Sequence, residues 1–351
     1  MKTRVCCLHE AKDLRIETRD IVAPKAGEVR VALGAGGICG SDLHYYQHGG
    51  FGTIRVKEPI ILGHEAAGFV EELGEGVTGL KVGDMVALNP SINCGTCEYC
   101  TQGLEMHCTD MIFSGSAMRS PHVQGMYRDK ITLAAAQCVP VTGDVSVAEA
   151  ACSEPLAVCM HAHSLVGDLQ DKRVLVMGAG PIGVLCTALA KAAGAFEIVV
   201  ADLQDVPLNV ASEMGATTTI NVMNNTTTMA EYAQGKGYFD ACFECTGAAP
   251  ALVSALGALR PRGVIVQVGM GGDTAIPLGV LVAKELTHRG TFRFYNEFQQ
   301  AVTAISTRSI DVRPMITAQM PLDKAVEAFE LAGDRTQAVK VHLMFNTDSA
   351  T

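Results

Sequence analysis

Short apolar stretches separated by glycine-containing turns fill the first part of the chain. Residues 29–33, 67–74 and 81–87 follow this pattern, which is typical of strands bounded by turn residues. Segments with helical periodicity are few here. Closely spaced strands with few helices predict a β-rich, barrel-like lobe.

The pattern of apolar positions changes near residue 155. Continuous apolar stretches, typical of strands buried on both faces, now alternate with helical segments. The expected helices cover residues 157–166 and 181–193, and the expected strands cover 172–177, 197–201, 238–244 and 263–268. Strands that alternate with helices predict βαβ units and a doubly wound parallel sheet.

From about residue 291 the chain is expected to return to the first lobe, with a helix at 323–331 and a strand at 339–343. The sequence therefore predicts an α/β protein of two domains. Residues 1–155 and 291–351 form one domain, and residues 156–290 form the other. A chain of 351 residues suits two cores of ordinary size. The polar run at 224–228 is expected to be a surface loop.

Charge and composition exclude several classes of function. The net charge is −10 and no basic run occurs, so the chain lacks the electrostatic footprint of a nucleic-acid-binding protein. No apolar window is long enough to predict a membrane span, and the residues after Met1 do not resemble a signal peptide. Thirteen cysteines without an export signal indicate reduced thiols and a cytoplasmic protein.

The clearest chemical feature is a Cys-x2-Cys-x2-Cys-x7-Cys run. It consists of Cys94, Cys97, Cys100 and Cys108. Four thiolates on so short a loop can converge on one tetrahedral ion, as in a structural zinc site. An iron–sulfur cluster is the alternative, but the bacterial ferredoxin run has its fourth cysteine closer and followed by proline, whereas Thr109 follows here.

Burial without a metal is the other interpretation of any cysteine, because a free thiol behaves as a small apolar group. We expect it for eight of the remaining cysteines: Cys6, Cys7, Cys138, Cys152, Cys159, Cys186, Cys242 and Cys245.

A glycine motif lies at the start of the βαβ region. Residues 178–183, Gly-Ala-Gly-Pro-Ile-Gly, follow an apolar strand and open a helix, and Asp202 ends the next strand. This context makes the motif a dinucleotide-binding fingerprint, in which Gly178 permits the tight turn, Gly180 admits the pyrophosphate and Gly183 allows close packing. Asp202 would bind the ribose hydroxyls and repel a 2′-phosphate, and no arginine follows it, so NAD is expected. A glycine-rich turn in an unrelated α/β fold is the alternative.

Candidate ligands for a second metal lie upstream. Cys39, His64 and a glutamate would supply the three protein ligands of a catalytic zinc and leave one position open for water or substrate. Taken alone, Cys39 could equally be a buried thiol and His64 a core histidine.

Five motifs occur in an order that identifies a family. They are Cys39-Gly40-Ser41-Asp42, Gly63-His64-Glu65, the four-cysteine run, Ser153-Glu154-Pro155-Leu156 and the glycine fingerprint. The chain resembles the zinc-dependent medium-chain alcohol and polyol dehydrogenases over essentially its whole length, and within them the sorbitol dehydrogenase branch. Longer segments at 36–47, 108–111, 115–118, 121–123 and 268–272 are similar to those of members that act on a sugar acid.

The resemblance implies a GroES-like catalytic domain, a Rossmann cofactor domain and both a catalytic and a structural zinc. Cys39 and His64 match the constant ligands of the catalytic zinc. Glu154 matches a glutamate that approaches this zinc directly or through water, and Glu65 matches one that is a direct ligand in only some members. Asp42 matches the residue that orients a histidine ligand.

The same resemblance suggests further roles. Ser41 and His44 match the hydroxyl and imidazole that pass the substrate proton outward. Arg293 matches an arginine that points into the active site of sorbitol dehydrogenase-like members, and here it would meet a sugar-acid carboxylate, although a surface arginine is the alternative. Tyr45 would bind substrate hydroxyls. Arg119 and His122 are weaker substrate candidates. The residues expected at the cofactor site are Gly178, Gly180, Pro181, Ile182, Gly183, Asp202 and Val268.

The expected reaction is hydride transfer between NAD and a secondary alcohol of a sugar acid, with zinc polarising the alcohol oxygen. A polyol such as sorbitol or xylitol is the alternative substrate. A zinc- and nucleotide-binding protein without catalysis is a remote alternative. Members of the family usually form homodimers or homotetramers, so a homo-oligomer is expected.

Overall fold

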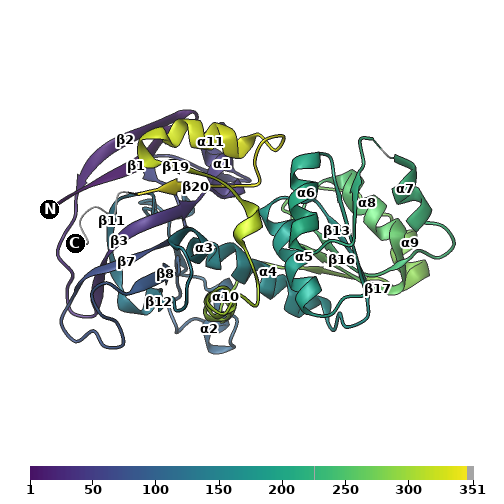
Figure 1. Cartoon of the computed structure of the whole chain (residues 1–351), viewed down its shortest axis with the longest axis horizontal. Helices are drawn as coiled ribbons and strands as arrows, with labels where there is room; N and C mark the ends of the chain where they lie inside the picture. Colours follow the sequence, from purple (N-terminus) through teal and green to yellow (C-terminus); the bar gives the residue numbers. More distant parts are fainter. Residues whose placement is uncertain (225, 346–351) are drawn as a thin grey trace.

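The structure is a computed structural model that describes residues 1–224 and 226–345. Figure 1 shows two lobes side by side along the long axis. A β-rich lobe contains the first strands and the last ones, drawn in purple and yellow, and an α/β lobe contains the middle of the chain. This arrangement confirms the predicted α/β class.

The β-rich lobe is built on a seven-stranded sheet with the order β12-β8-β7-β3-β20-β19, in which β11 also pairs with β3. Its strands are β3 (Glu28–Gly37), β7 (Glu65–Leu73), β8 (Met85–Leu88), β11 (Lys130–Ala134), β12 (Cys138–Pro140), β19 (Ile316–Pro321) and β20 (Lys340–Met344). β3 lies at the centre and is buried from Val29 to Gly37. Because β20 pairs antiparallel with β3, the end of the chain completes the sheet that its beginning starts.

A second sheet of this lobe has the order β2-β1-β6, and β4-β5 and β9-β10 form two short two-stranded sheets. These strands are β1 (Lys2–Glu10), β2 (Asp13–Asp20), β4 (Gly50–Phe51), β5 (Ile54–Arg55), β6 (Ile60–Ile61), β9 (Ser91–Ile92) and β10 (Ile112–Phe113). The helices of the lobe are α1 (Gly40–His48), α2 (Glu98–Thr101), α3 (Val147–Ala151), α10 (Glu297–Ser306) and α11 (Ala325–Gly333). Short 3₁₀ turns cover Glu105–His107, Ala135–Gln137, Arg313–Met315 and Leu322–Lys324.

The α/β lobe is a six-stranded sheet in the order β15-β14-β13-β16-β17-β18, and every neighbouring pair is parallel. Its strands are β13 (Arg173–Met177), β14 (Glu197–Asp202), β15 (Thr218–Asn221), β16 (Phe239–Glu244), β17 (Leu259–Gln267) and β18 (Thr287–Gly290). Its helices are α4 (Ser153–Val166), α5 (Pro181–Ala192), α6 (Asp205–Met214), α7 (Thr226–Tyr232), α8 (Ala249–Ala258) and α9 (Leu278–Lys284). The strand order reverses at β13, so the carboxyl ends of β13 and β16 border a crevice suited to a ligand.

Helices cover both faces of this sheet, because successive strand side chains point to opposite sides. On β13, Val174 and Val176 pack in one apolar cluster with α4, α5 and α6, while Leu175 and Met177 pack in another with α8. Burial on both faces explains why the strand is apolar throughout.

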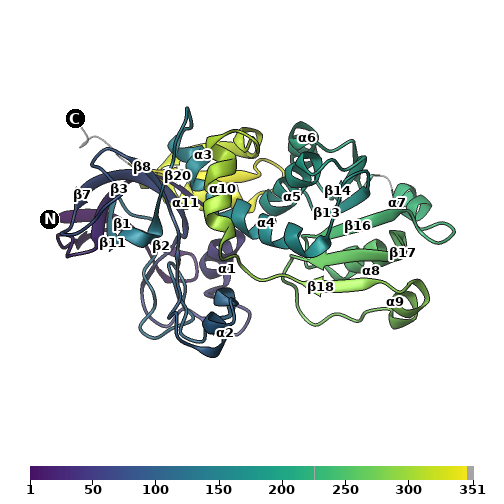
Figure 2. The same ribbon diagram turned by 90° about the horizontal axis from the view of Figure 1, so that it is seen from below.

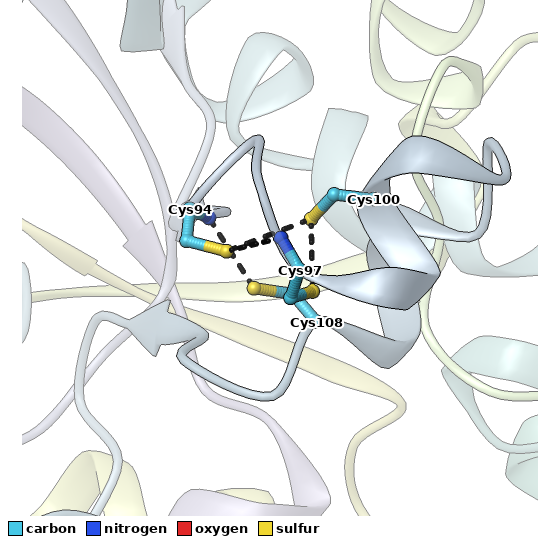
Figure 3. A group of neighbouring side chains, drawn as sticks. All are labelled: Cys94, Cys97, Cys100 and Cys108. Atoms are coloured by element: carbon cyan, nitrogen blue, oxygen red, sulfur yellow. Dashed lines mark hydrogen bonds between the residues drawn. The ribbon is translucent and has the colours of Figure 1, made fainter.

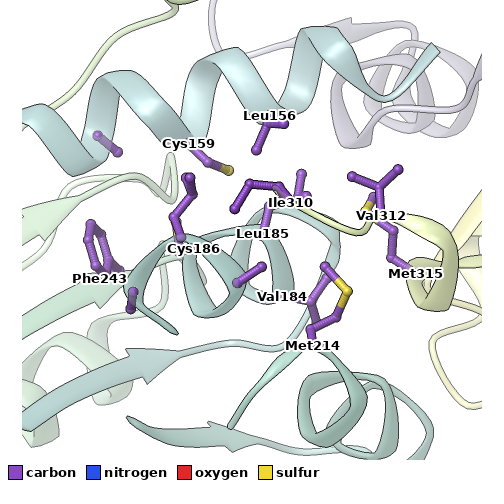
Figure 4. Packing of buried hydrophobic residues seen from close by; sticks show 14 of the residues in the cluster. Leu156, Cys159, Val184, Leu185, Cys186, Met214, Phe243, Ile310, Val312 and Met315 are labelled. Atoms are coloured by element: carbon purple, nitrogen blue, oxygen red, sulfur yellow. The ribbon is translucent and has the colours of Figure 1, made fainter. Parts of the chain in front are cut away.

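Apolar side chains join the two lobes (Figure 4). Leu156 and Cys159 of α4 lie over Val184, Leu185 and Cys186 of α5. Ile310, Val312 and Met315, from the segment that returns to the β-rich lobe, belong to the same cluster. In Figure 2, α4 and α10 lie between the lobes. The cleft therefore lies beside a packed hinge region.

Most of the predicted elements are found within one or two residues of the observed bounds. The predicted loop at 224–228 is wrong in part, because α7 begins at Thr226, and Asn225 lies outside the described residues. Threonine has a low helix propensity, because its β-branched side chain loses rotamer freedom in a helix, so a run of threonines is easily taken for a loop. Within the described residues, none of the helices is both long and apolar enough to span a membrane.

Candidate active site and metal centres

Four cysteine sulfurs converge around α2 (Figure 3). The sulfurs of the four-cysteine run all lie within 4.8 Å of one another. Those of Cys97 and Cys100 are 3.5 Å apart, and those of Cys94 and Cys100 are 4.0 Å apart. Zn–S bonds of about 2.3 Å give a tetrahedron with edges of about 3.8 Å. The four sulfurs therefore fit one zinc ion.

Backbone amides favour the thiolate form in this loop. The Cys97 amide donates to Cys94 Sγ over 3.3 Å, and the Cys94 amide donates to Cys108 Sγ over 3.2 Å. Amide hydrogen bonds lower the pKa of Cys94, and they lower that of Cys97 to about 5. Desolvation raises the pKa of Cys100 to about 12. A bound cation would release the remaining protons.

A second donor group brings together Cys39, His64 and Glu65, whose ligand atoms all lie within 4.8 Å of one another. Cys39 is the N-cap of α1, and His64 and Glu65 stand where β7 begins. Cys39 and Glu65 line a cavity of 240 Å³ that also contacts the glycine fingerprint. Two separate segments thus present sulfur, nitrogen and oxygen donors to one point in the cleft.

Glu154 lies outside this compact group, although its charge interacts with His64. It is buried in the first turn of α4, and burial raises its pKa to about 8. Of the two candidate glutamates, Glu65 is therefore the one that the structure brings closest to Cys39 and His64.

The charges of the site fit a divalent cation. Burial is the main cause that raises the pKa of Cys39 to about 12, and the neighbouring charge of Glu65 adds to it. A thiolate, Glu65, Glu154 and the fully buried Asp42 would place more negative charge here than one lysine, Lys340, can balance. Because buried charges need partners, this donor set suits zinc.

Asp42 joins the two segments that carry these donors. Its carboxylate accepts hydrogen bonds from the amides of Cys39 (3.1 Å) and Gly63 (3.3 Å), and His64 Nδ1 lies 3.7 Å from it. The hydroxyl of Tyr127 is 2.7 Å from Asp42 Oδ2 and 2.7 Å from the Gly37 carbonyl. Sequence reasoning anticipated Asp42 and missed Tyr127.

Gly63 is required beside His64 for two reasons. Its φ of +95° lies in the left-handed region, which favours glycine. A Cβ at this position would stand 2.3 Å from the Tyr127 ring. The tyrosine therefore packs against the backbone that carries His64.

Lys340 is a further residue that the sequence reasoning did not assign. Its ammonium group forms an ion pair with Glu65 Oε2 and donates to the Ile38 carbonyl over 3.1 Å. Both Lys340 and Glu65 are 1% exposed. The sequence did offer a signal for this pair. A lone lysine in the apolar segment 339–343 is expected to be buried, and a buried lysine needs a charged partner.

Ser41 and His44 lie on α1, directly after Cys39. Burial raises the pKa of the Cys39 thiol, and the nearby Ser41 side chain opposes that shift. His44 is exposed and lines a cavity of 390 Å³, together with Phe51 of the same lobe and Met270 of the other. Burial, and then the charge of His48, lower the pKa of His44. An imidazole at this edge of the cleft can exchange protons with water.

Arg293 faces the same region from the loop after β18. Its guanidinium carbon lies 4.4 Å from the ring centre of Phe113, which in turn lies 5.5 Å from the His64 ring. Burial lowers the pKa of Arg293, whereas the charges of Glu154 and Tyr45 oppose that shift. Among the described residues, Arg293 takes part in none of the ion pairs, and its Nη2 lies 3.4 Å from Met118 Sδ, so its charge is available to a ligand.

Tyr45 is 5% exposed, and its hydroxyl accepts a hydrogen bond from the Ala117 amide over 3.3 Å. The two weaker substrate candidates are engaged elsewhere. Arg119 pairs with Asp110 at 2.6 Å, and His122 Nε2 accepts the Lys57 amide at 2.9 Å. Arg119 and His122 therefore hold the loop structure.

A third group of possible ligands, Cys7, His9 and Glu17, lies on the β1–β2 hairpin. His9 Nε2 and Glu17 Oε1 are 2.5 Å apart, and Arg19 also pairs with Glu17. The Glu17 carboxylate is therefore already engaged in a hydrogen bond and an ion pair.

The glycine fingerprint adopts the geometry that its spacing predicts. Gly178 has a φ of +92°, and a Cβ there would lie 2.8 Å from Thr246. A Cβ on Gly183 would lie 1.8 Å from the Gly178 carbonyl oxygen. Gly180 is the N-cap of α5, so the positive end of the helix faces the crevice.

The remaining cofactor candidates lie along the same crevice. Pro181 and Ile182 line the 240 Å³ cavity with Cys39. Asp202 lines a neighbouring cavity of 590 Å³, which is bounded mostly by apolar side chains. Val268 follows β17, and its amide donates to the Glu244 carbonyl over 2.8 Å. The Arg335 side chain reaches both cavities and was not foreseen from the sequence.

Two family models match the chain. The alcohol dehydrogenase GroES-like domain covers residues 25–143, and the zinc-binding dehydrogenase model covers residues 181–307. L-Idonate 5-dehydrogenase (NAD(P)(+)) of Escherichia coli K12 is 42% identical over 346 residues, 98% of this chain and 99% of that enzyme. Sorbitol dehydrogenase of Gallus gallus is 36% identical over 342 residues, 96% of this chain and 94% of that enzyme.

Solved structures agree with these matches. The crystal structure of the Escherichia coli L-idonate 5-dehydrogenase has a TM-score of 0.94 and covers 98% of this chain and 99% of that one. The 2R,3R-butanediol dehydrogenase of Bacillus subtilis, 28% identical, has a TM-score of 0.87 and covers 98% of this chain and 100% of that one. With its two groups of candidate metal ligands, its glycine fingerprint and these relatives, the chain belongs to the zinc-dependent medium-chain alcohol dehydrogenases.

Proposed function

We propose that this enzyme transfers a hydride between NAD and a secondary alcohol of a sugar acid, with L-idonate and 5-keto-D-gluconate as the reversible pair. The observation that carries the proposal is the 42% identity to L-idonate 5-dehydrogenase over 98% of the chain. Arg293 gives a physical reason for an anionic substrate, because it is a cation without an ion-pair partner among the described residues.

Cys39 and His64 would hold the catalytic zinc, with Glu65 or Glu154 as the third protein ligand. Zinc bound there supplies a Lewis acid for the oxygen atom of the alcohol or ketone. Cys94, Cys97, Cys100 and Cys108 would hold a structural zinc. Asp42 and Tyr127 keep the Cys39 and His64 segments in register, since both contact the backbone or side chains of these segments.

Ser41 and His44 would carry the proton released from the alcohol. Ser41 is the inner member because it lies in the first turn of α1, two residues after Cys39. His44 is the outer member because it is exposed at the cavity mouth. The lowered pKa of His44 keeps its imidazole neutral near pH 7, and so able to accept a proton.

The cofactor would lie across the carboxyl ends of β13, β14 and β16. Gly178, Gly180 and Gly183 leave room for the pyrophosphate at the N-terminus of α5. Pro181, Ile182 and Val268 border this path, and Asp202 marks the adenosine ribose. The 240 Å³ cavity, which Cys39 and Gly180 both line, would receive the nicotinamide end.

The Arg293 carboxyl-binding role can be tested by substrate comparison. Initial rates are measured on L-idonate, sorbitol, xylitol and L-threonine, for the wild type and Arg293→Gln. We expect the KM for L-idonate to rise roughly tenfold in the variant, because a charge-assisted bond is lost, while kinetics on sorbitol change little.

Arg119→Gln is the matched control, because Arg119 is an arginine of the neighbouring loop already paired with Asp110. If the wild type prefers sorbitol to L-idonate, the sugar-acid assignment fails and a polyol dehydrogenase is left. Absence of turnover on all four substrates, with one zinc per chain, would instead favour the non-catalytic alternative.

We also propose domain boundaries near residues 155 and 290. The parallel sheet ends with β18 at Gly290, and the later strands β19 and β20 join the sheet of the β-rich lobe. Because none of the 13 cysteines, all within the described residues, forms a disulfide, we propose that the protein works in the reducing cytoplasm.

A homodimer or homotetramer is proposed as well. β18 is an edge strand, and α9 before it exposes Leu278 (69%) and Val282 (77%). An open edge beside exposed apolar residues suits pairing with a second copy. Sedimentation of the wild type and Val282→Asp would test this, and a monomeric wild type would contradict it.

A further inference from the structure

Every lone pair of the Asp202 carboxylate is already used. Oδ1 accepts the amides of Leu203 (2.6 Å) and Gln204 (3.0 Å). Oδ2 accepts the amide of Ala179 (2.6 Å) and Nη2 of Arg335 (2.6 Å). A carboxylate offers about four acceptor positions, so ribose hydroxyls find none free. A ribose can bind here only if one donor leaves.

Arg335 is the donor that can leave. The three amides belong to the loops that form the crevice itself, and Asp202 is 4% exposed at its side chain. Arg335 instead comes from the segment between α11 and β20, in the other lobe, and its side chain is 46% exposed. Its rotation disturbs no secondary structure. The Asp202–Arg335 ion pair is therefore a replaceable bridge across the cleft.

The guanidinium lies between the two parts of the crevice. Its nearest atom is 3.7 Å from the point where a Cβ on Gly180 would stand. Arg335 borders both the 240 Å³ and the 590 Å³ cavity, and among the described residues that line the larger one it is the sole basic side chain. A phosphate on the ribose beside Asp202 would thus meet one cation, Arg335.

We propose that Arg335 determines which cofactor the cleft accepts at the ribose 2′ position. With NAD, the ribose diol takes the place of Arg335 on Asp202. With NADP, the 2′-phosphate takes the place of Asp202 on Arg335, whose planar guanidinium suits a phosphate. The cleft therefore binds both cofactors, although Asp202 alone would select NAD. This inference rests on the proposed cofactor crevice.

The test compares 5′-AMP with adenosine 2′,5′-bisphosphate, which differ only in the 2′-phosphate. Calorimetric titrations are made on the zinc-loaded wild type, Arg335→Gln, Arg335→Lys and Arg260→Gln. In Arg335→Gln we expect the bisphosphate affinity to fall roughly tenfold or more, and 5′-AMP binding to stay the same or tighten. Arg335→Lys should recover part of the bisphosphate affinity, because it keeps the charge without the planar fork.

Arg260→Gln is the matched control, since Arg260 of the α/β lobe is also a half-exposed arginine paired with an aspartate, Asp240, at 2.5 Å. It should change neither affinity. Equal losses for both ligands in Arg335→Gln would assign Arg335 to the shared 5′-phosphate and overturn the proposal, as would no loss for either. If the wild type binds neither ligand nor NAD, the crevice itself is wrongly assigned and both proposals fall.

Discussion

The Lys340 ammonium group and the Glu65 carboxylate form an ion pair in which both side chains are 1% exposed. Removing one partner of a buried pair leaves an uncompensated charge, which costs about 3–5 kcal/mol. We therefore expect Lys340→Met to lower the midpoint of urea unfolding strongly. The double variant Glu65→Gln/Lys340→Met should recover much of that loss, because it removes both charges.

An unchanged midpoint in Lys340→Met would contradict this account and show that Glu65 has another partner. Lys12→Met is a suitable control, because Lys12 forms an exposed pair with Glu330. Exposed pairs contribute about 0–1 kcal/mol, so its midpoint should stay near that of the wild type.

Loss of the two proposed zinc ions should have different effects, one on stability and the other on turnover. Cys97→Ser should reduce the zinc content from two ions per chain to one and lower the melting temperature, because a structural zinc contributes directly to folding. Cys39→Ser should also lose one zinc, but it should keep its fold and lose activity. Elemental analysis, thermal melting and initial rates together check both statements.

Cys138→Ser serves as the control, since Cys138 is a buried free cysteine outside either ligand group. Its zinc content should be unchanged. Two zinc ions retained in Cys97→Ser would mean that the four-cysteine loop does not bind the metal.

Glu154 should make the zinc-free protein less stable as the pH rises. Burial raises its pKa from 4.5 to about 8 in the folded state, so between these values the folded protein binds more protons than the unfolded chain. Stability then falls with increasing pH, with a limiting slope of about 1.4 kcal/mol per pH unit. Unfolding of chelator-treated wild type and Glu154→Gln from pH 5 to 8 measures this effect.

The difference between the two proteins isolates Glu154, because loss of the structural zinc is common to both. As the pH rises, the free energy of unfolding of Glu154→Gln should increase relative to that of the wild type. Parallel stability curves would show that Glu154 does not take up a proton on folding.

His48 should affect the pH dependence of alcohol oxidation through His44, the proposed proton acceptor. The charge of His48 lowers the pKa of His44, whose ring lies 5.9 Å away. His48→Gln removes that repulsion, so the pKa of His44 rises. The acid limb of the kcat–pH profile should move to higher pH, and in His44→Gln it should disappear.

His9→Gln is the control for this profile, because His9 lies on β1 and bonds to Glu17. Its acid limb should coincide with that of the wild type. A shift in the opposite direction in His48→Gln would exclude His44 as the group that titrates.

Local pattern located part of the α/β lobe, but it did not anticipate α6, β15, α8, α9 or β18. β13, α5 and β14 were expected within a few residues of their bounds, because each strand is buried on both faces and therefore apolar throughout. The Thr226 segment shows the limit, since a short polar helix has no apolar stripe by which to recognise it.

Motifs located the donor groups whose members stand close together in sequence, such as the four cysteines. Tyr127, Lys340 and Arg335 escaped notice because their partners are remote. Tyr127 meets Asp42 across 85 positions, and Arg335 meets Asp202 across 133. Periodicity reports which face of an element is buried, but not which distant strand or loop lies against it.

The position of β20 between β3 and β19 also constrains the order of synthesis and folding. The α/β lobe is one continuous stretch, so it can complete its sheet while the ribosome is still adding residues. The β-rich lobe lacks an inner strand until residues 340–344 have emerged, and until then the end of β3, at residues 35–37, lacks a partner on the edge that β11 pairs only at residues 28–32. During translation the α/β lobe should therefore fold first, although the β-rich lobe begins earlier in the chain. The β-rich lobe should finish folding last, when Lys340 and the rest of β20 are added to its sheet.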